Sequence, residues 1–312
     1  MQAYIVQSPI LFLIFNRPDL TQRVFEQIRA VRPPRLYIAA DGPRDDHATD
    51  AILCEQARAV EKQADWPCTV RTLFRERNLG CKEAVSQAIT WFFEHEAEGI
   101  ILEDDCLPGS SFFGFCDALL QKYRHEDRVR IITGSNMQNG RQWGDASYYF
   151  SRYGNIWGWA TWRRVWDRYD AGLSQYTEAD AARHLRRIFD DPFLVAAWEK
   201  IFANQKAGNI DTWDYQLQFI TFFENGLCAT PNVNLVSNLG FRADGTHTFD
   251  PANHGSGVPV GELTIRTHPA GFTPETEADY YFMAREYDLA QQWRRHRKWK
   301  NRMKRWMKSL FQ

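Results

Sequence analysis

The chain has 312 residues, of which 44% are hydrophobic and 25% are charged, and its formal net charge is −1. This length and apolar content suit one large domain with an appendage, or two modest domains. No apolar run reaches the ~20 residues that span a bilayer, and the start lacks the basic region of a signal peptide. We therefore expect a cytoplasmic protein that is at most peripheral on the inner face of the plasma membrane.

Strand and helix patterns alternate through the first hundred residues. Short apolar runs predict strands at 9–15, 35–40 and 69–74. Helical periodicity predicts a helix after each of them, at 20–31, 50–64 and 82–94. Such alternation is typical of an α/β fold with a single, mainly parallel, doubly wound sheet and flanking helices.

Polar residues follow each predicted strand. Arg17 comes after the first, Asp41 after the second and Asn78 after the third. The carboxyl ends of parallel strands meet at one edge of a sheet, where ligands gather in open α/β folds. We expect these side chains to lie together at that edge.

Three acids, Glu103, Asp104 and Asp105, follow the apolar run 99–102, which predicts a fourth strand. Clustered carboxylates raise one another's pKa unless a cation lies among them. Oxygen ligands favour Mg²⁺ or Mn²⁺, and such ions commonly bridge carboxylates to the phosphates of a substrate. The alternative is an acidic N-cap for a helix expected at 110–123.

An aromatic segment follows in the middle of the chain. Trp157 and Trp159 lie in a glycine-bearing loop, which favours contact with a sugar ring for at least one of them. Trp162 and Trp166 are four residues apart on a helix expected to begin near residue 160, and this spacing favours the core. They are interpreted as packing residues.

Two further acids, Asp211 and Asp214, open a helix expected at 215–223. A carboxylate there suits a general base, which removes the proton of an attacking hydroxyl. Asp214 is the first choice and Asp211 the reserve. The alternative is an N-cap at Asp211 or Thr212, and both roles can coexist.

Together these pieces resemble the GT-A-fold nucleotide-diphospho-sugar glycosyltransferases and are most similar to the N-acetylglucosaminyltransferase I type. The resemblance covers roughly residues 8 to 250. It implies that Asp105 ligates the metal and that Asp214 is the base. In the loop at 238–248 it suggests a phosphate contact for Arg242 and a metal ligand at His247, although a lone loop histidine is more often simply exposed. The strand ends, the acidic triplet and this resemblance together predict the donor-binding residues Arg17, Asp41, Asn78, Glu103, Asp104 and Arg242.

The resemblance implies a metal-dependent enzyme, with Mn²⁺ or Mg²⁺, that moves a sugar from a nucleotide diphosphate to a hydroxyl of a glycan or glycolipid acceptor. UDP-sugar is the expected donor, and bacterial surface polysaccharide synthesis the expected setting. A sugar-phosphate nucleotidyltransferase is an alternative, although the glycine-rich, Lys-bearing loop of that class is absent after the first strand. A non-catalytic carbohydrate-binding protein with the same fold is another. Dehydrogenase and kinase are excluded, because neither GxGxxG after a strand nor GxxxxGK[ST] occurs.

We expect a catalytic domain at 1–270, with a donor half to about 135 and an acceptor half beyond it, and a C-terminal extension at 271–312. Residues 291–312 hold nine Lys or Arg and no acid, so residues 1–290 carry a formal charge of −10. Helical spacing places four apolar residues on one stripe, which favours an interfacial helix on an anionic membrane. Docking on the acidic catalytic domain is the alternative, and nucleic acid is not an expected partner. The stripe consists of Trp299, Met303, Trp306 and Leu310.

Overall fold

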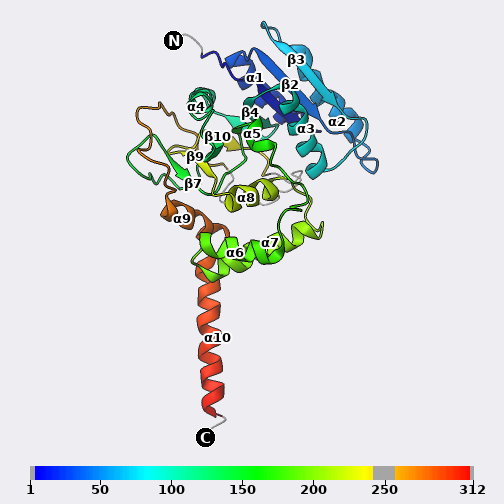
Figure 1. Ribbon diagram of the computed structural model, residues 1–312. Helices are drawn as coiled ribbons and strands as arrows, with labels where there is room; N and C mark the ends of the chain where they lie inside the picture. Colours follow the sequence, from blue (N-terminus) through cyan, green and yellow to red (C-terminus); the bar gives the residue numbers. More distant parts are fainter. Residues whose placement is uncertain (1–3, 242–256, 310–312) are drawn as a thin grey trace.

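A computed structural model describes residues 4–241 and 257–309, without the side chains of 301, 302 and 304–309. The predicted mainly parallel α/β fold is confirmed, because the described residues form an eight-stranded sheet flanked by helices (Figure 1). The sheet runs in the order β3 (Thr69–Phe74), β2 (Arg35–Ala40), β1 (Ile10–Ile14), β4 (Glu98–Glu103), β8 (Trp159–Trp162), β6 (Val129–Thr133), β9 (Leu227–Pro231) and β7 (Tyr148–Ser151).

The two halves of the sheet differ in strand direction. From β3 through β4 every pairing is parallel, whereas β8 runs antiparallel to both β4 and β6. Beyond it β9 is parallel to β6, and β7 is antiparallel to β9. A separate two-stranded sheet joins β5 (Cys106–Pro108) to β10 (Val236–Asn238). The parallel half therefore carries all four of the predicted strands.

The predicted helices of the first half are confirmed. They are α1 (Pro18–Val31), α2 (Asp50–Arg58) with the 3₁₀ turn η1 (Ala59–Gln63), α3 (Cys81–His95) and α4 (Ser110–Lys122). Helix α1 begins with Pro18, whose fixed φ suits a first turn, and it ends at Arg32 in the left-handed conformation. Its apolar residues are buried on one side, as its periodicity predicts.

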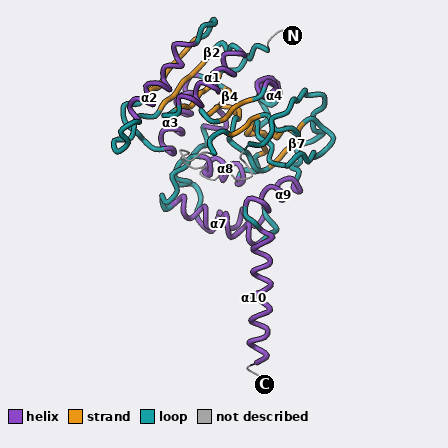
Figure 2. The backbone as a smooth tube through the Cα atoms, turned by 180° about the vertical axis from the view of Figure 1, so that it is seen from behind, coloured by secondary structure: helices purple, strands orange, loops and turns teal. Residues whose placement is uncertain are grey.

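A second hydrophobic core lies among helices on one side of the sheet (Figures 1 and 2). It centres on Trp198, whose side chain is fully buried. The segment after residue 270 packs against the sheet and this second core. The Glu275 N–H donates to the Phe150 carbonyl, and Met283 and Leu289 are buried in the second core. The helices concerned are α6 (Glu178–Ile188), α7 (Pro192–Lys206), α8 (Asp214–Phe223), α9 (Thr276–Glu286) and the start of α10 (Leu289–Ser309).

The helix expected near residue 160 is wrong in its first turn. Residues 159–162 form strand β8, and the short helix α5 (Arg163–Trp166) follows it. Trp162 and Trp166 are nevertheless buried, as the core interpretation predicts. Dense aromatic residues suit a buried strand as well as a buried helix, so periodicity alone misassigned the element.

In the described part of the chain, no helix has both the length and the apolar character that crossing a bilayer requires.

Asp50 fixes the loop that connects β2 to α2. Its carboxylate is 1% exposed and accepts hydrogen bonds from the Asn16 amide (2.8 Å) and from Nε of Arg44 (2.6 Å). These contacts tie the loop to the end of β1. The hydrogen bonds from Arg44 are the main reason that the pKa of Asp50 falls to about 2.

We predict that Asp50→Asn lowers the free energy of unfolding by about 1 to 3 kcal/mol at pH 7, because it breaks a buried ion pair. The folded-state pKa is depressed, so this stability is present above pH ~4 and is lost as the pH falls through ~2. Urea unfolding at pH 7 and pH 3 should show the gap to wild type narrowing at pH 3. The exposed neighbour variant Asp45→Asn is the control, and an Asp50→Asn variant as stable as this control at pH 7 would contradict the assignment.

Candidate active site

A cavity of about 570 Å³ opens beyond the carboxyl ends of β1, β2 and β4. Arg17, Asp41, Asn78 and Asp105 all line it, so the expected meeting of the strand ends is confirmed. Acidic and basic side chains share the lining. A negatively charged ligand fits such a cavity only if a bound cation or the arginines offset the charge of the carboxylates. The ionisable Asp, Glu and Arg residues among the described lining are Asp41, Glu103, Asp104, Asp105, Asp211, Asp214, Arg17, Arg44 and Arg75.

The guanidinium of Arg17 joins the two aspartates of the acidic triplet. One of its terminal nitrogens pairs with Asp104, and the other lies 3.0 Å from Oδ2 of Asp105. Asp104 is buried and also accepts the N–H of Phe15 at 3.2 Å. A bidentate guanidinium between two carboxylates fixes both in position. Arg17 and Asp104 thus hold Asp105 at the cavity wall.

Glu103 has the most perturbed environment of the triplet. Burial and the negative charges of Asp105 and Asp104 raise its pKa to about 8, and the charge of Asp214 adds to the effect. Burial also raises the pKa of Asp104, against the opposing influence of Arg17. The proposed N-cap role for the triplet is wrong, because α4 begins after Gly109 and has no acid in its first turn.

The chain after β10 wraps around Asp105. Asn238, which also lines the cavity, accepts the N–H of Gly240 at 2.7 Å, and the Asp105 carbonyl accepts the N–H of Leu239 at 2.8 Å. A Cβ at Gly240 would overlap the Asp105 carboxylate. The absence of a side chain at Gly240 is therefore what lets this segment pass the carboxylate.

Asp41 and Asn78 lock two strand-end loops together. The Asp41 carboxylate accepts the N–H groups of Leu79 (3.0 Å) and Gly80 (3.2 Å), and the Asn78 amide donates to the carbonyl of Gly42 (2.9 Å). Burial raises the pKa of Asp41, although these backbone donors oppose the shift. Both side chains keep a place in the cavity lining, and donor contact by them stays a prediction.

Asp211 and Asp214 line the same cavity but have different partners. Oδ1 of Asp211 accepts the N–H of Lys82 at 3.2 Å, in the first turn of α3. Asp214 lies in the first turn of α8 and accepts the hydroxyl of Thr212. The expected cap of α8 by Asp211 or Thr212 is wrong, because Trp213 occupies that position without a side-chain bond. Asp211 supports a different helix.

The two loop tryptophans lie in different environments. Trp157 lines the cavity and packs edge-on against Phe241, so a ligand-facing role for it stays a prediction. Trp159 is 1% exposed in β8 and stacks on Trp213, so acceptor contact by Trp159 is wrong. All four residues of β8 are buried, so the strand offers no ligand-facing position. Gly158 allows the turn between them with a φ of +66°.

The carboxylates of the cavity fit a divalent cation only if a bound substrate supplies the remaining oxygen ligands of the metal. Among the described residues no group of three His, Cys, Asp or Glu side chains is placed to hold a metal. Asp105 does present a carboxylate at the cavity, and Mg²⁺ or Mn²⁺ is commonly held by one or two carboxylates together with substrate phosphates. Arg242 and His247, predicted for phosphate and metal, lie outside the described residues.

Sequence reasoning missed two arginines of the cavity. Arg44 follows β2 in the run Asp41-Gly42-Pro43-Arg44, and Arg75 comes directly after β3. Both positions carry the signal used for Arg17, a polar residue at the end of a parallel strand. Two of the three lining guanidinium groups are already in ion pairs, Arg17 with Asp104 and Asp105 and Arg44 with Asp50, so a phosphate group would meet them beside those carboxylates.

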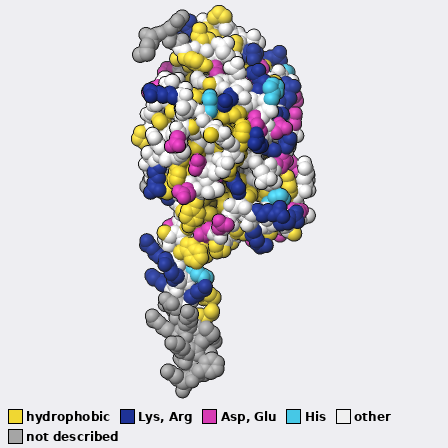
Figure 3. Space-filling model, turned by 60° about the vertical axis from the view of Figure 1, so that its left-hand side comes forward, with side chains coloured by type: hydrophobic (Ala, Val, Ile, Leu, Met, Phe, Trp, Pro, Cys, Tyr) yellow, Lys and Arg dark blue, Asp and Glu magenta, His cyan; other side chains and the backbone are white. Residues whose placement is uncertain are grey.

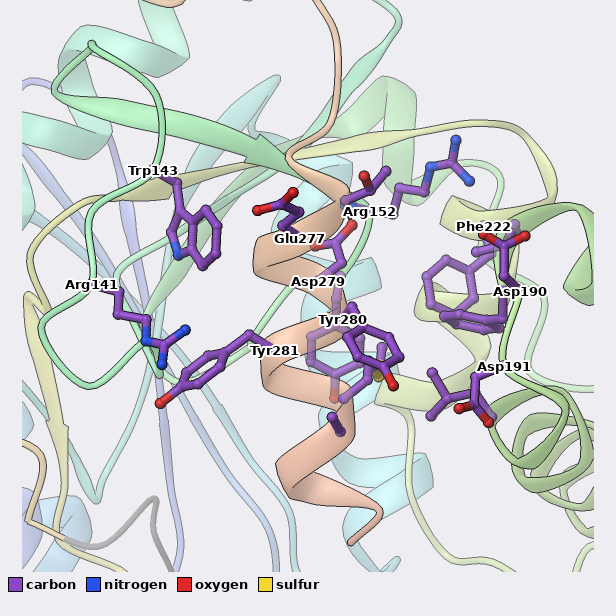
Figure 4. Close-up of a pocket in the computed structure, with 17 residues that line it drawn as sticks. Arg141, Trp143, Arg152, Asp190, Asp191, Phe222, Glu277, Asp279, Tyr280 and Tyr281 are labelled. Carbon is purple, nitrogen blue, oxygen red and sulfur yellow. Dashed lines mark hydrogen bonds between the residues drawn. The ribbon is translucent and has the colours of Figure 1, made fainter. Parts of the chain in front are cut away.

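A second cavity, of about 640 Å³, lies beside α9 (Figure 4). Trp143, Tyr280 and Tyr281 contribute aromatic walls. One of its acids, Asp279, accepts the hydroxyl of Ser151 and the N–H of Arg152 (3.0 Å), which joins α9 to β7. This carboxylate therefore has a structural role. None of the predicted site residues that the structure describes lines this cavity.

No protein-family model matches the chain, and no curated protein matches it either. Solved structures show a weak likeness. An inositol-1-phosphate CTP transferase from T. maritima has a TM-score of 0.30 and 9% identity over 52% of this chain and 73% of its own. HddC from Yersinia pseudotuberculosis has a TM-score of 0.30 and 10% identity over 52% of this chain and 80% of its own. A UDP-glucose pyrophosphorylase complexed with UDP-glucose has a TM-score of 0.30 and 9% identity over 54% of this chain and 81% of its own. A likeness of this size carries no argument about chemistry.

We predict that Gly240→Ala lowers the free energy of unfolding by about 1 to 3 kcal/mol, because the added methyl group overpacks against Asp105 and Asn238. Thermal unfolding should show a melting temperature a few degrees below that of wild type. Gly271→Ala is the matched control, because a Cβ there meets nothing within 4 Å. A Gly240→Ala protein that melts with the control would show that the segment does not press on Asp105.

Proposed function

We propose that the chain is a glycosyltransferase that binds a nucleotide sugar in the cavity lined by Asp41 and Asp105. One observation carries the proposal: the strand-end residues and the candidate base Asp214, 109 positions after Asp105, line the same cavity. Asp214 is near enough for its charge to raise the pKa of Glu103. The arrangement offers a phosphate-binding end and a carboxylate for proton removal in one space.

The proposed reaction places each group in a role. The oxygen of an acceptor hydroxyl attacks the anomeric carbon of the donor sugar, and the bond from that carbon to the diphosphate oxygen breaks. The hydroxyl proton passes to the carboxylate of Asp214, and the nucleoside diphosphate departs with the bonding electron pair. In this proposal Arg75 is the cavity cation whose positive charge offsets that of the departing diphosphate, because the charge of Arg44 is already balanced by Asp50.

A divalent cation held by Asp105 would neutralise charge on the diphosphate as it departs. The chain's own residues prepare its place. Arg17 offsets one of the two negative charges of Asp104 and Asp105, and Gly240 has no side chain that would overlap the Asp105 carboxylate. We propose Mn²⁺ or Mg²⁺, a UDP-sugar donor and a glycan or glycolipid acceptor, as expected for surface polysaccharide synthesis in a bacterium.

Sugar-phosphate nucleotidyl transfer is the second candidate, and the weakly similar structures include a CTP transferase and a UDP-glucose pyrophosphorylase. The three arginines of the cavity suit a nucleoside triphosphate as well as a nucleotide sugar. Its attacking group is a sugar phosphate, which needs no base to remove a hydroxyl proton. The segment after β1 also passes through Arg17 directly into α1, without a glycine-rich loop. Asp214 would then have no chemical role.

We predict that Asp214→Asn lowers the rate of glycosyl transfer about 10²- to 10⁴-fold and leaves donor affinity within about twofold, since the amide keeps the shape but accepts no proton. Release of UDP from a panel of UDP-sugars with acceptor glycans measures the rate, and calorimetry measures donor binding. Asp211→Asn is the matched control, and it should weaken the first turn of α3 more than it slows turnover.

Two results would contradict this assignment. Wild-type turnover in Asp214→Asn would remove Asp214 from the chemistry, and an equal loss in Asp211→Asn alone would move the base there. Pyrophosphate release from UTP and a sugar 1-phosphate, at the same rate in wild type and Asp214→Asn and without UDP release from any nucleotide sugar, would establish the second candidate.

A further inference from the structure

Helix α10 stands clear of the body over most of its length (Figures 1 and 2). At 21 residues it extends ~30 Å. Among the described residues, the contacts of α10 with the rest of the chain lie in its first turns. Leu289 is buried in the second core, and Trp293 packs edge-on against Phe193 while its indole N–H donates to Asp191 at 2.8 Å. The base of the helix is therefore fixed, and its remainder needs a partner that the described body does not supply.

The projecting part carries apolar side chains into solvent. Trp299 is 55% exposed and Met303 is 39% exposed. They are four residues apart, so they lie on the same side of the helix. In the sequence, apolar residues continue at 306 and 310, after steps of three and four. Most of the stability of a protein helix comes from packing of its apolar face, so a surface that covers these side chains would stabilise α10.

The same helix is strongly cationic. Residues 289–312 hold nine Lys or Arg and no acid, against a formal charge of −10 for the rest of the chain. Arg294, Arg295, Arg297, Lys298 and Lys300 are all exposed. Figure 3 shows basic and apolar side chains together on the described part of the projecting helix. A partner that fits this helix must therefore offer both negative charge and an apolar region that can bury these side chains.

Three other occupants meet one of these conditions but not both. The acidic body offers charge, but beyond its first turns the helix projects away from the body (Figures 1 and 2). A second copy of the helix would cover the stripe but would bring two sets of nine cations together. Nucleic acid would pair with the cations and leave Trp299 and Met303 in water.

We propose that α10 binds the surface of an anionic lipid bilayer, with its apolar stripe at the level of the headgroups and acyl chains and its cations against anionic headgroups. Tryptophan suits that boundary because its ring is apolar and its N–H is polar. The fixed base then holds the body beside the membrane. The inference is independent of the reaction proposed for the cavity.

Sedimentation with vesicles tests the proposal on the full chain. Vesicles with about one-third phosphatidylserine should bind the protein at low salt, and pure phosphatidylcholine vesicles should not. Each cation near such a surface is worth about fivefold in binding. Reversing two charges with Lys298→Glu and Lys300→Glu should therefore reduce binding at least tenfold, and Trp299→Ser should also reduce it. Binding should weaken as salt rises.

The matched control reverses two exposed cations of the body, Arg23→Glu and Lys62→Glu, and it should keep the binding of wild type. Circular dichroism and melting temperature check that each variant is folded. Failure of the full chain to bind anionic vesicles at low salt would overturn the proposal. An equal loss in the body control would overturn it too, as would unchanged binding in the Lys298→Glu, Lys300→Glu protein. Self-association through α10 without vesicle binding would assign the helix to a second copy instead.

Discussion

The ion triad of Arg17, Asp104 and Asp105 is the interaction on which the candidate site depends. It joins the end of β1 to the end of β4, two neighbouring parallel strands at the centre of the sheet. Without the guanidinium, two carboxylates this close to the core would repel each other, and protonation of one of them would be favoured. With it, Asp104 becomes a buried support and Asp105 stays at the cavity wall.

Other contacts extend this arrangement outward from the triad. Asp41 holds the turn before α3, Asp211 caps that helix from across the cavity, and Gly240 allows the chain to pass Asp105. Each links segments far apart in sequence. The cavity therefore has a rigid frame made by the same polar residues that line it, and pre-organised polar groups are what transfer chemistry requires.

The parallel half of the sheet was predictable because its signals are local. Short Ile- and Leu-rich runs alternate with periodic helices, and the rule that ligands gather at strand ends places Arg17, Asp41, Asn78 and Asp105 together. The rest depended on distant contacts. Nothing near Asp211 in sequence shows that it caps α3, and the tryptophans around residue 160 suit a strand as well as a helix. Arg44 and Arg75 carried the right local signal and were overlooked beside the more conspicuous acids.

The proposed role of Asp105 is to hold a cation together with a nucleotide diphosphate. Calorimetric titration of UDP with and without Mn²⁺ tests this role on the wild-type chain, on Asp105→Asn and on the exposed-loop control Asp145→Asn. We expect Mn²⁺ to strengthen UDP binding at least tenfold in wild type and in the control, and we expect Asp105→Asn to abolish this gain while remaining folded. A gain of the same size in Asp105→Asn, or none in wild type, would contradict it.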